Sequence, residues 1–91
     1  MKAKPDMQSS DVVPLHTVAA DQWIRIYSLP RGLLYAQFIR VGVSEGEQVK
    51  CIERLPGGTI VIQKNRQQIA IGHVLARQIF VVVVRQEERI V

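Results

Sequence analysis

The chain has 91 residues, of which 47% are hydrophobic and 22% charged, and its formal net charge is +4 at pH 7. This length accommodates one domain, and this composition excludes an intrinsically disordered chain. Because Cys51 is the one cysteine, an intrachain disulfide is excluded and a reducing, cytoplasmic compartment is favoured. The most apolar run, residues 79–84, is far shorter than the roughly 20 residues of a membrane-spanning helix, so no membrane insertion is predicted.

The termini are predicted to be tails around one folded domain. We expect a flexible N-terminal tail over residues 1–14, the domain over residues 15–84 and a C-terminal tail over residues 85–91. Residues 1–30 hold three charges of each sign, whereas residues 31–91 hold nine Lys or Arg against five Glu. The positive excess is therefore carried by the later part of the chain. It is typical of a solubilising surface, or of one that meets an acidic partner or a nucleic acid.

A first strand is predicted over residues 23–29. Ile24 and Ile26 alternate with polar neighbours, which is the two-residue period of a strand with one buried face. The outward positions of this strand are then Arg25 and Tyr27.

The next segment has the spacing of a helix. Leu34, Phe38 and Val41 lie at i, i+4 and i+7, as on one helix face, and Gly42 follows where a left-handed cap is expected. The sequence therefore predicts one helix of about three turns, which buries this stripe of apolar residues.

Extended chain returns after Gly46. Apolar residues alternate over residues 47–55, 59–64 and 67–71, and the apolar run at 79–84 ends the series. Five short strands, tight hairpins and one inserted helix predict an all-β fold with one short helix. Its architecture is expected to be a small, strongly bent antiparallel barrel of about five strands.

The adjacent glycines Gly57 and Gly58 raise the question of a phosphate-binding loop. Such a loop leads from a strand into a helix and ends in Gly-Lys followed by Ser or Thr, whereas these glycines follow Pro56 between two predicted strands. The pattern therefore predicts a turn without a bound nucleotide. The glycines predicted to shape turns are Gly42, Gly46, Gly57, Gly58 and Gly72.

No residues show the spacing of a catalytic centre, so no enzyme activity is predicted. His16 and His73 belong to no HExxH, HxH or CxxC pattern. Cys51 falls on the inward face of its strand, where an unpaired cysteine behaves as a small hydrophobe. Strand alternation places Glu47 and Glu53 on that same face, where carboxylates could bind Fe²⁺, although we expect them in solvent at the strand ends. The candidate metal ligands are Cys51, His73, Glu47 and Glu53.

The order of segments over residues 14–82 resembles the FeoA family, the small cytosolic proteins of bacterial ferrous iron transport. The chain departs from the family pattern at Gln37 and Phe38, where Arg and Leu are common, and at Glu45, which replaces a proline. The positions that match the pattern are Leu15, Gly42, Gly46, Val49, Ala70, Ala76, Ile79 and Val81.

The resemblance implies an SH3-like barrel, similar to the C-terminal domain of iron-dependent transcriptional repressors. It implies an accessory or regulatory role without enzyme activity, and it implies a partner, the membrane ferrous iron transporter FeoB with its cytosolic GTP-binding domain. Association of identical chains is compatible with such a role.

Three functions are compatible with these features of the sequence. The first is an adaptor that binds the transporter, and its contact energy should concentrate in outward aromatic and arginine side chains. The second is a metal-sensing SH3-like module related to the repressor domain. The third is a basic nucleic-acid-binding barrel, which the scarcity of aromatic residues among the basic ones disfavours. The candidate partner anchors are Arg25, Tyr27, Tyr35 and Arg40.

Overall fold

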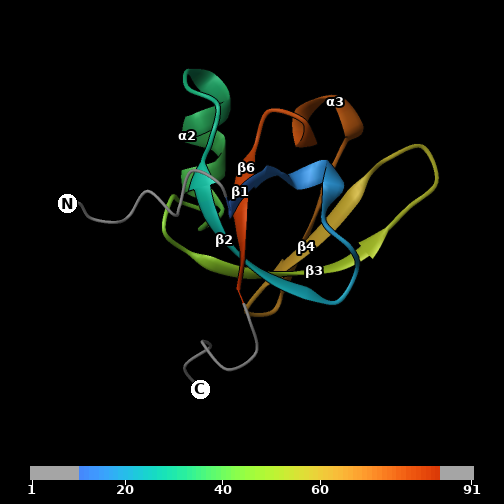
Figure 1. Cartoon of the computed structure of the whole chain (residues 1–91). Helices are drawn as coiled ribbons and strands as arrows, with labels where there is room; N and C mark the ends of the chain where they lie inside the picture. Colours follow the sequence, from blue (N-terminus) through green and yellow to red (C-terminus); the bar gives the residue numbers. More distant parts are fainter. Residues whose placement is uncertain (1–10, 85–91) are drawn as a thin grey trace.

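The computed structural model describes residues 11–84, which form one bent sheet with short helices at one end (Figure 1). The elements in chain order are β1 (Val12–Pro14), the 3-10 turn η1 (Leu15–Thr17), β2 (Gln22–Ser28), α2 (Leu33–Arg40), β3 (Gln48–Arg54), β4 (Ile60–Lys64), β5 (Gln67–Ile71), α3 (His73–Ala76) and β6 (Phe80–Val84).

The sheet confirms the predicted antiparallel, mostly β architecture. Its order is β1-β6-β2-β3-β4-β5, and every neighbouring pair is antiparallel. The edge strands β1 and β5 do not pair with each other, so residues 11–84 form an open barrel of six strands rather than a closed one of about five. Figure 1 shows α2 and α3 at the same end of this sheet.

The additional strand corrects the predicted N-terminal tail. Val12 pairs with Val82 and Pro14 with Phe80, so the part of the tail from Val12 onward belongs to the sheet. A strand of three residues is too short to show a period of its own, and it is held by its long-range partner β6. Residues 1–10 and 85–91, which make up the rest of the predicted tails, lie outside the described residues.

The core lies inside the bend of the sheet. Ile24 and Ile26 point inward from β2, as their alternation predicted, and Cys51 is fully buried on β3. The largest fully buried side chains are Leu15, Ile24, Ile26, Ile60, Ile62, Ile79, Val43, Val49, Val81 and Cys51.

Helix α2 is shorter than predicted, and only one of its side chains is buried in the core. It has 8 residues, about two turns, and its buried residue is Phe38. At its end the N–H of Val43 donates to the carbonyl of Phe38 (2.9 Å) and that of Gly42 to Ile39 (3.0 Å). This is a Schellman motif, and it requires the positive φ of +89° at Gly42 that the sequence predicted.

The paired glycines form the predicted turn between β3 and β4. Gly57 and Gly58 have φ of +89° and +94°, and the N–H of Gly58 donates to the carbonyl of Leu55 (3.1 Å). Gly72 differs from the prediction because its φ is −65° and its backbone is extended at the N-terminal cap of α3. Any residue can adopt that conformation, so Gly72 is not required for a turn. The longest helix within residues 11–84 is α2 with 8 residues, so none of the helices there could span a membrane.

Candidate functional site

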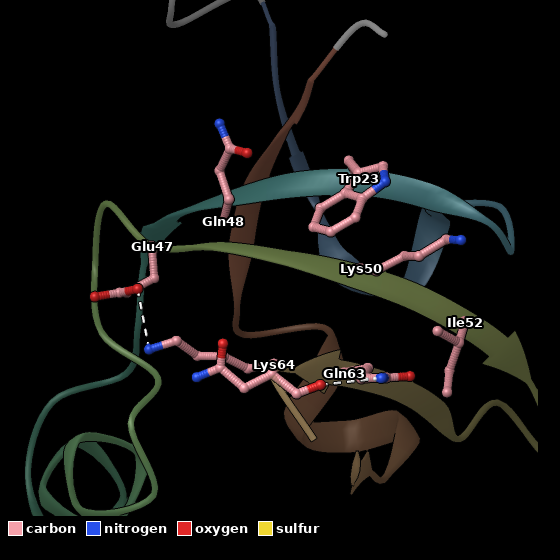
Figure 2. A pocket seen from close by; sticks show the side chains of 8 residues that line it. Trp23, Glu47, Gln48, Lys50, Ile52, Gln63 and Lys64 are labelled. Atoms are coloured by element: carbon pink, nitrogen blue, oxygen red, sulfur yellow. Dashed lines mark hydrogen bonds and ion pairs between the residues drawn. The ribbon is translucent and has the colours of Figure 1, made fainter. Parts of the chain in front are cut away.

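A groove of about 550 Å³ lies on the outer face of the sheet (Figure 2). Its residues include one row across three strands, in which Trp23 of β2 is opposite Lys50 of β3, and Lys50 is opposite Gln63 of β4. The ion pair between Lys64 Nζ and Glu47 Oε1, 3.0 Å long, borders the groove. This groove combines an indole, amines and carboxamides, and the full lining is Trp23, Glu47, Gln48, Lys50, Ile52, Gln63, Lys64 and Asn65.

A second hollow, of about 200 Å³, lies between α2, β5 and α3, and we call it the α2–β5 cleft. Leu34 and Val41, which were predicted to face the core beside Phe38, line this cleft and remain 39% and 37% exposed. A helix of two turns at the end of the sheet leaves them only partly covered. The cleft is mostly apolar, and its lining is Leu34, Gln37, Phe38, Val41, Ile69, Ala70, Ile71 and Leu75.

The predicted partner anchors come from two elements, β2 and α2, and differ in burial. Arg25 and Tyr27 are exposed on the outer face of β2, as alternation predicted, and Arg40 is exposed at the end of α2. Tyr35 was expected to point away from the core, but it is partly buried and packs against it. The guanidinium of Arg31 covers its ring at 4.4 Å from the centroid. Tyr35 is therefore part of the packing that holds α2.

Glu45 connects the loop before β3 to the end of β2. Its carboxylate accepts a hydrogen bond from the backbone N–H of Leu29 (3.0 Å) and one from Arg31 (3.2 Å). These bonds, that of Leu29 first, lower the pKa of Glu45 despite its partial desolvation. Glu45, which departs from the resembled pattern, thus binds two residues of the segment between β2 and α2.

The predicted metal ligands Glu47, Cys51 and Glu53, on and just before β3, do not point to one site. Burial raises the pKa of the Cys51 thiol, and Glu47 is paired with Lys64. Glu53 is exposed near the end of β3, as we expected, because a β-bulge between Cys51 and Glu53 interrupts the nominal alternation that would place both on one face. No group of three or more His, Cys, Asp or Glu within residues 11–84 is arranged to hold a metal ion.

The structure brings together two histidines that looked isolated in the sequence. The ring centroids of His16 in η1 and His73 in α3 are 5.8 Å apart, with the rings nearly perpendicular. Arg54 Nη1 donates to the carbonyls of His16 and Val18, each at 2.7 Å, and so fixes η1. His16 Nδ1 is buried and has no hydrogen-bond partner in the described part of the chain. No spacing in the sequence could reveal this pair, because α3 and η1 meet only through folding.

Acidification is expected to destabilise the fold through His16. Desolvation, followed by nearby positive charges of which Arg77 is the strongest, lowers the pKa of His16 below its usual 6.5. The unfolded chain therefore binds a proton at higher pH than the folded chain, and the free energy of unfolding falls as the pH drops from about 6.5 towards the folded-state pKa. Thermal unfolding at a series of pH values should show a flatter dependence for His16→Asn. Parallel curves for both proteins in this range would contradict the prediction.

Comparison with known proteins gives one family and one fold. A family model described as the FeoA domain matches residues 13–83. A crystal structure of an iron uptake regulatory protein (FeoA) has a TM-score of 0.69 and 26% identity, and the match covers 80% of this chain and 99% of that one. No curated protein matches the chain.

Two more distant structures share the fold. An NMR structure of a FeoA-like protein from Clostridium acetobutylicum has a TM-score of 0.69 at 15% identity and covers 88% of this chain and 95% of that one. The metal-dependent transcriptional regulator MtsR has a TM-score of 0.69 at 14% identity. That match covers 79% of this chain but 34% of the regulator, so the likeness concerns one part of that protein. The SH3-like architecture implied by the resemblance is thereby confirmed.

Proposed function

Since the chain belongs to the FeoA domain family, which is linked to iron uptake, we propose that it is an accessory protein of ferrous iron uptake. In this proposal it acts by binding the cytosolic part of a FeoB-like membrane transporter. Binding requires no catalytic group, and the chain then regulates transport by contact alone.

The observation that carries the proposal is the exposed apolar surface of α2. Leu33 is 76% exposed, Leu34 39% and Ile39 42%, although the helix has only 8 residues. Scattered apolar residues are common on protein surfaces, but several on one short helix beside an apolar cleft are typical of a surface that binds another protein. A partner that covers them would remove this apolar area from water, which favours association.

The proposal predicts that a strain lacking this chain takes up ferrous iron more slowly, and that the wild-type chain restores uptake. Purified chain should also retain the cytosolic part of the transporter in a pull-down. Uptake that is unaffected by the deletion, or a chain that does not retain the transporter, would contradict the adaptor function.

The exposed candidate anchors provide variants for the same assay. Arg25→Ala, Tyr27→Ala and Arg40→Ala should leave the thermal midpoint nearly unchanged, because surface substitutions cost within about 0.5 kcal/mol, and at least one should lose uptake. Tyr35 is replaced by Phe rather than Ala, since its ring packs against the core.

A metal-sensing module is the second candidate function, and the proximity of His16 and His73 favours it. Imidazole nitrogens suit several divalent transition metals, but the nearby guanidinium groups of Arg54 and Arg77 disfavour a cation. This function requires that ferrous ion raise the thermal midpoint of the wild-type chain and not that of His16→Asn.

A further inference from the structure

The free edge of the sheet nearest the α2–β5 cleft is strand β5. It pairs with β4 alone among the described strands. In a two-residue hairpin the flanking residues, here Lys64 and Gln67, form a hydrogen-bonded pair, and the pattern alternates from there. The backbone N–H and C=O groups of Gln68 and Ala70 therefore point away from β4. Both residues are exposed, so this part of the edge is open to another chain.

The two edges of the sheet differ in how they are protected. Edge strands usually avoid pairing with other chains by being short, or by carrying charges or proline. β1 has three residues and ends in Pro14, whereas β5 has five residues, Gln-Gln-Ile-Ala-Ile, without charge or proline. Ile69 and Ala70 of this unprotected edge also line the apolar cleft. A strand added beside β5 would therefore place alternate side chains towards the cleft.

The elements that form the cleft carry positive charges and no negative ones. Residues 33–40 and 54–84, which include every residue of α2, β5 and α3, contain no Asp or Glu. Arg40 at the end of α2, Arg66 in the turn before β5 and Arg77 at the end of α3 are exposed, and none forms an ion pair with another residue of 11–84. A second copy of this chain would bring like charges together at the cleft, whereas an acidic segment would meet opposite ones.

We propose that β5 and the α2–β5 cleft bind an extended segment in which apolar residues alternate with acidic ones, contributed by the cytosolic part of the transporter. This inference rests on the proposed function and identifies the surface through which it acts. The segment pairs with the backbone of Gln68 and Ala70, its apolar side chains contact Leu34 and Val41, and its carboxylates approach the arginines. Of the predicted anchors, Arg40 then belongs to the interface, and Arg25 and Tyr27 do not.

Amide hydrogen exchange tests the pairing directly. The full chain is measured alone and bound to the purified cytosolic part of the transporter. We expect exchange at Gln68 and Ala70 to slow on binding, while Ile69, whose N–H already points to β4, changes little. Exchange that slows on the outer face of β2 and not at β5 would overturn the proposal.

Calorimetric titration of variants of this chain with the same partner tests which residues form the interface. Leu34→Ser and Ala70→Pro should each weaken binding about tenfold or more, because one removes an apolar contact and the other a backbone donor. Val74→Ser replaces a residue that is exposed but outside the cleft lining, and Arg25→Ala removes a charge on another face, so both should bind within about twofold of wild type. Thermal unfolding of each variant accompanies the titrations, and Leu34→Ser keeps the test valid if Ala70→Pro does not fold.

The outcomes separate the two proposals. If the wild-type chain binds, and Leu34→Ser binds equally well while Arg25→Ala does not, the adaptor function stands and the β5 surface is wrong. If the wild-type chain does not bind, both fail. Sedimentation that shows a dimer of this chain dissolved by Ala70→Pro would assign the edge to a second copy and would also overturn the inference.

Discussion

Phe38→Ala is expected to lower the free energy of unfolding by about 3 kcal/mol. Large-to-small changes of a buried Phe cost about 3–5 kcal/mol, and the lower end applies here because Phe38 borders a cleft into which the site can relax. Phe38 is 7% exposed and is the buried residue of α2, so the helix loses its main contact with the core. The thermal midpoint should fall by on the order of 10–20 °C, which urea and thermal unfolding will measure.

Leu33→Ala is the matched control for this change. It removes an apolar side chain from the same helix, but Leu33 is largely exposed, so the cost should stay within about 0.5 kcal/mol. Equal losses for the two variants would show that α2 is held by something other than the insertion of Phe38. A chain of this size has about 5–13 kcal/mol of stability, so Phe38→Ala should remain folded at low temperature.

Gly58→Ala is expected to cost about 2–4 kcal/mol, from two separate causes. The backbone has φ of +94°, where an L side chain is strained by about 1–3 kcal/mol. An added Cβ would also lie 2.6 Å from His73 Nδ1 and 3.0 Å from His73 Cβ, which forces the His73 side chain, α3 or the turn to move. Equilibrium unfolding in urea measures the loss.

Gly57→Ala separates these causes. Gly57 has nearly the same φ, +89°, but an added Cβ there meets nothing within 4 Å, so only the backbone strain remains. The difference between the two variants estimates the contact with His73, and it should shrink when both are made in a His73→Ala background. If Gly57→Ala and Gly58→Ala cost the same, the contact with α3 contributes nothing. Protection of the wild-type chain by a nucleotide would instead contradict the assignment of these glycines to a turn.

Much of the fold could be predicted because short segments carry their own signal. The alternation of Ile24 and Ile26 places their side chains inward in any sheet with one buried face, and Cys51 is buried for the same reason. Gly42 and the Gly57–Gly58 pair have positive φ because only glycine adopts such angles without cost. The position of α2 could be predicted because the apolar residues there recur at helical spacing. The helix has about two turns rather than three, so it buries less of the predicted apolar stripe.

The candidate site depended on contacts between distant segments. The β-bulge after Cys51 changes the direction of the Glu53 side chain, and a bulge is a property of two paired strands that the alternation within one strand does not contain. The pairing of β1 with β6 and the meeting of His16 with His73 likewise leave no periodic pattern.

The sequence by itself therefore determined that Gly42, Gly57 and Gly58 form turns, that Ile24, Ile26 and Cys51 are buried in the strands, and that the positive charge lies in the later part of the chain, since each depends on near neighbours. Only the tertiary structure decided that β5 remains a free edge and that Leu34 of α2 and Val41, which caps this helix, line an apolar cleft with Ile69. Strand order and helix position are set by the sum of long-range packing contacts, which no local window of residues contains.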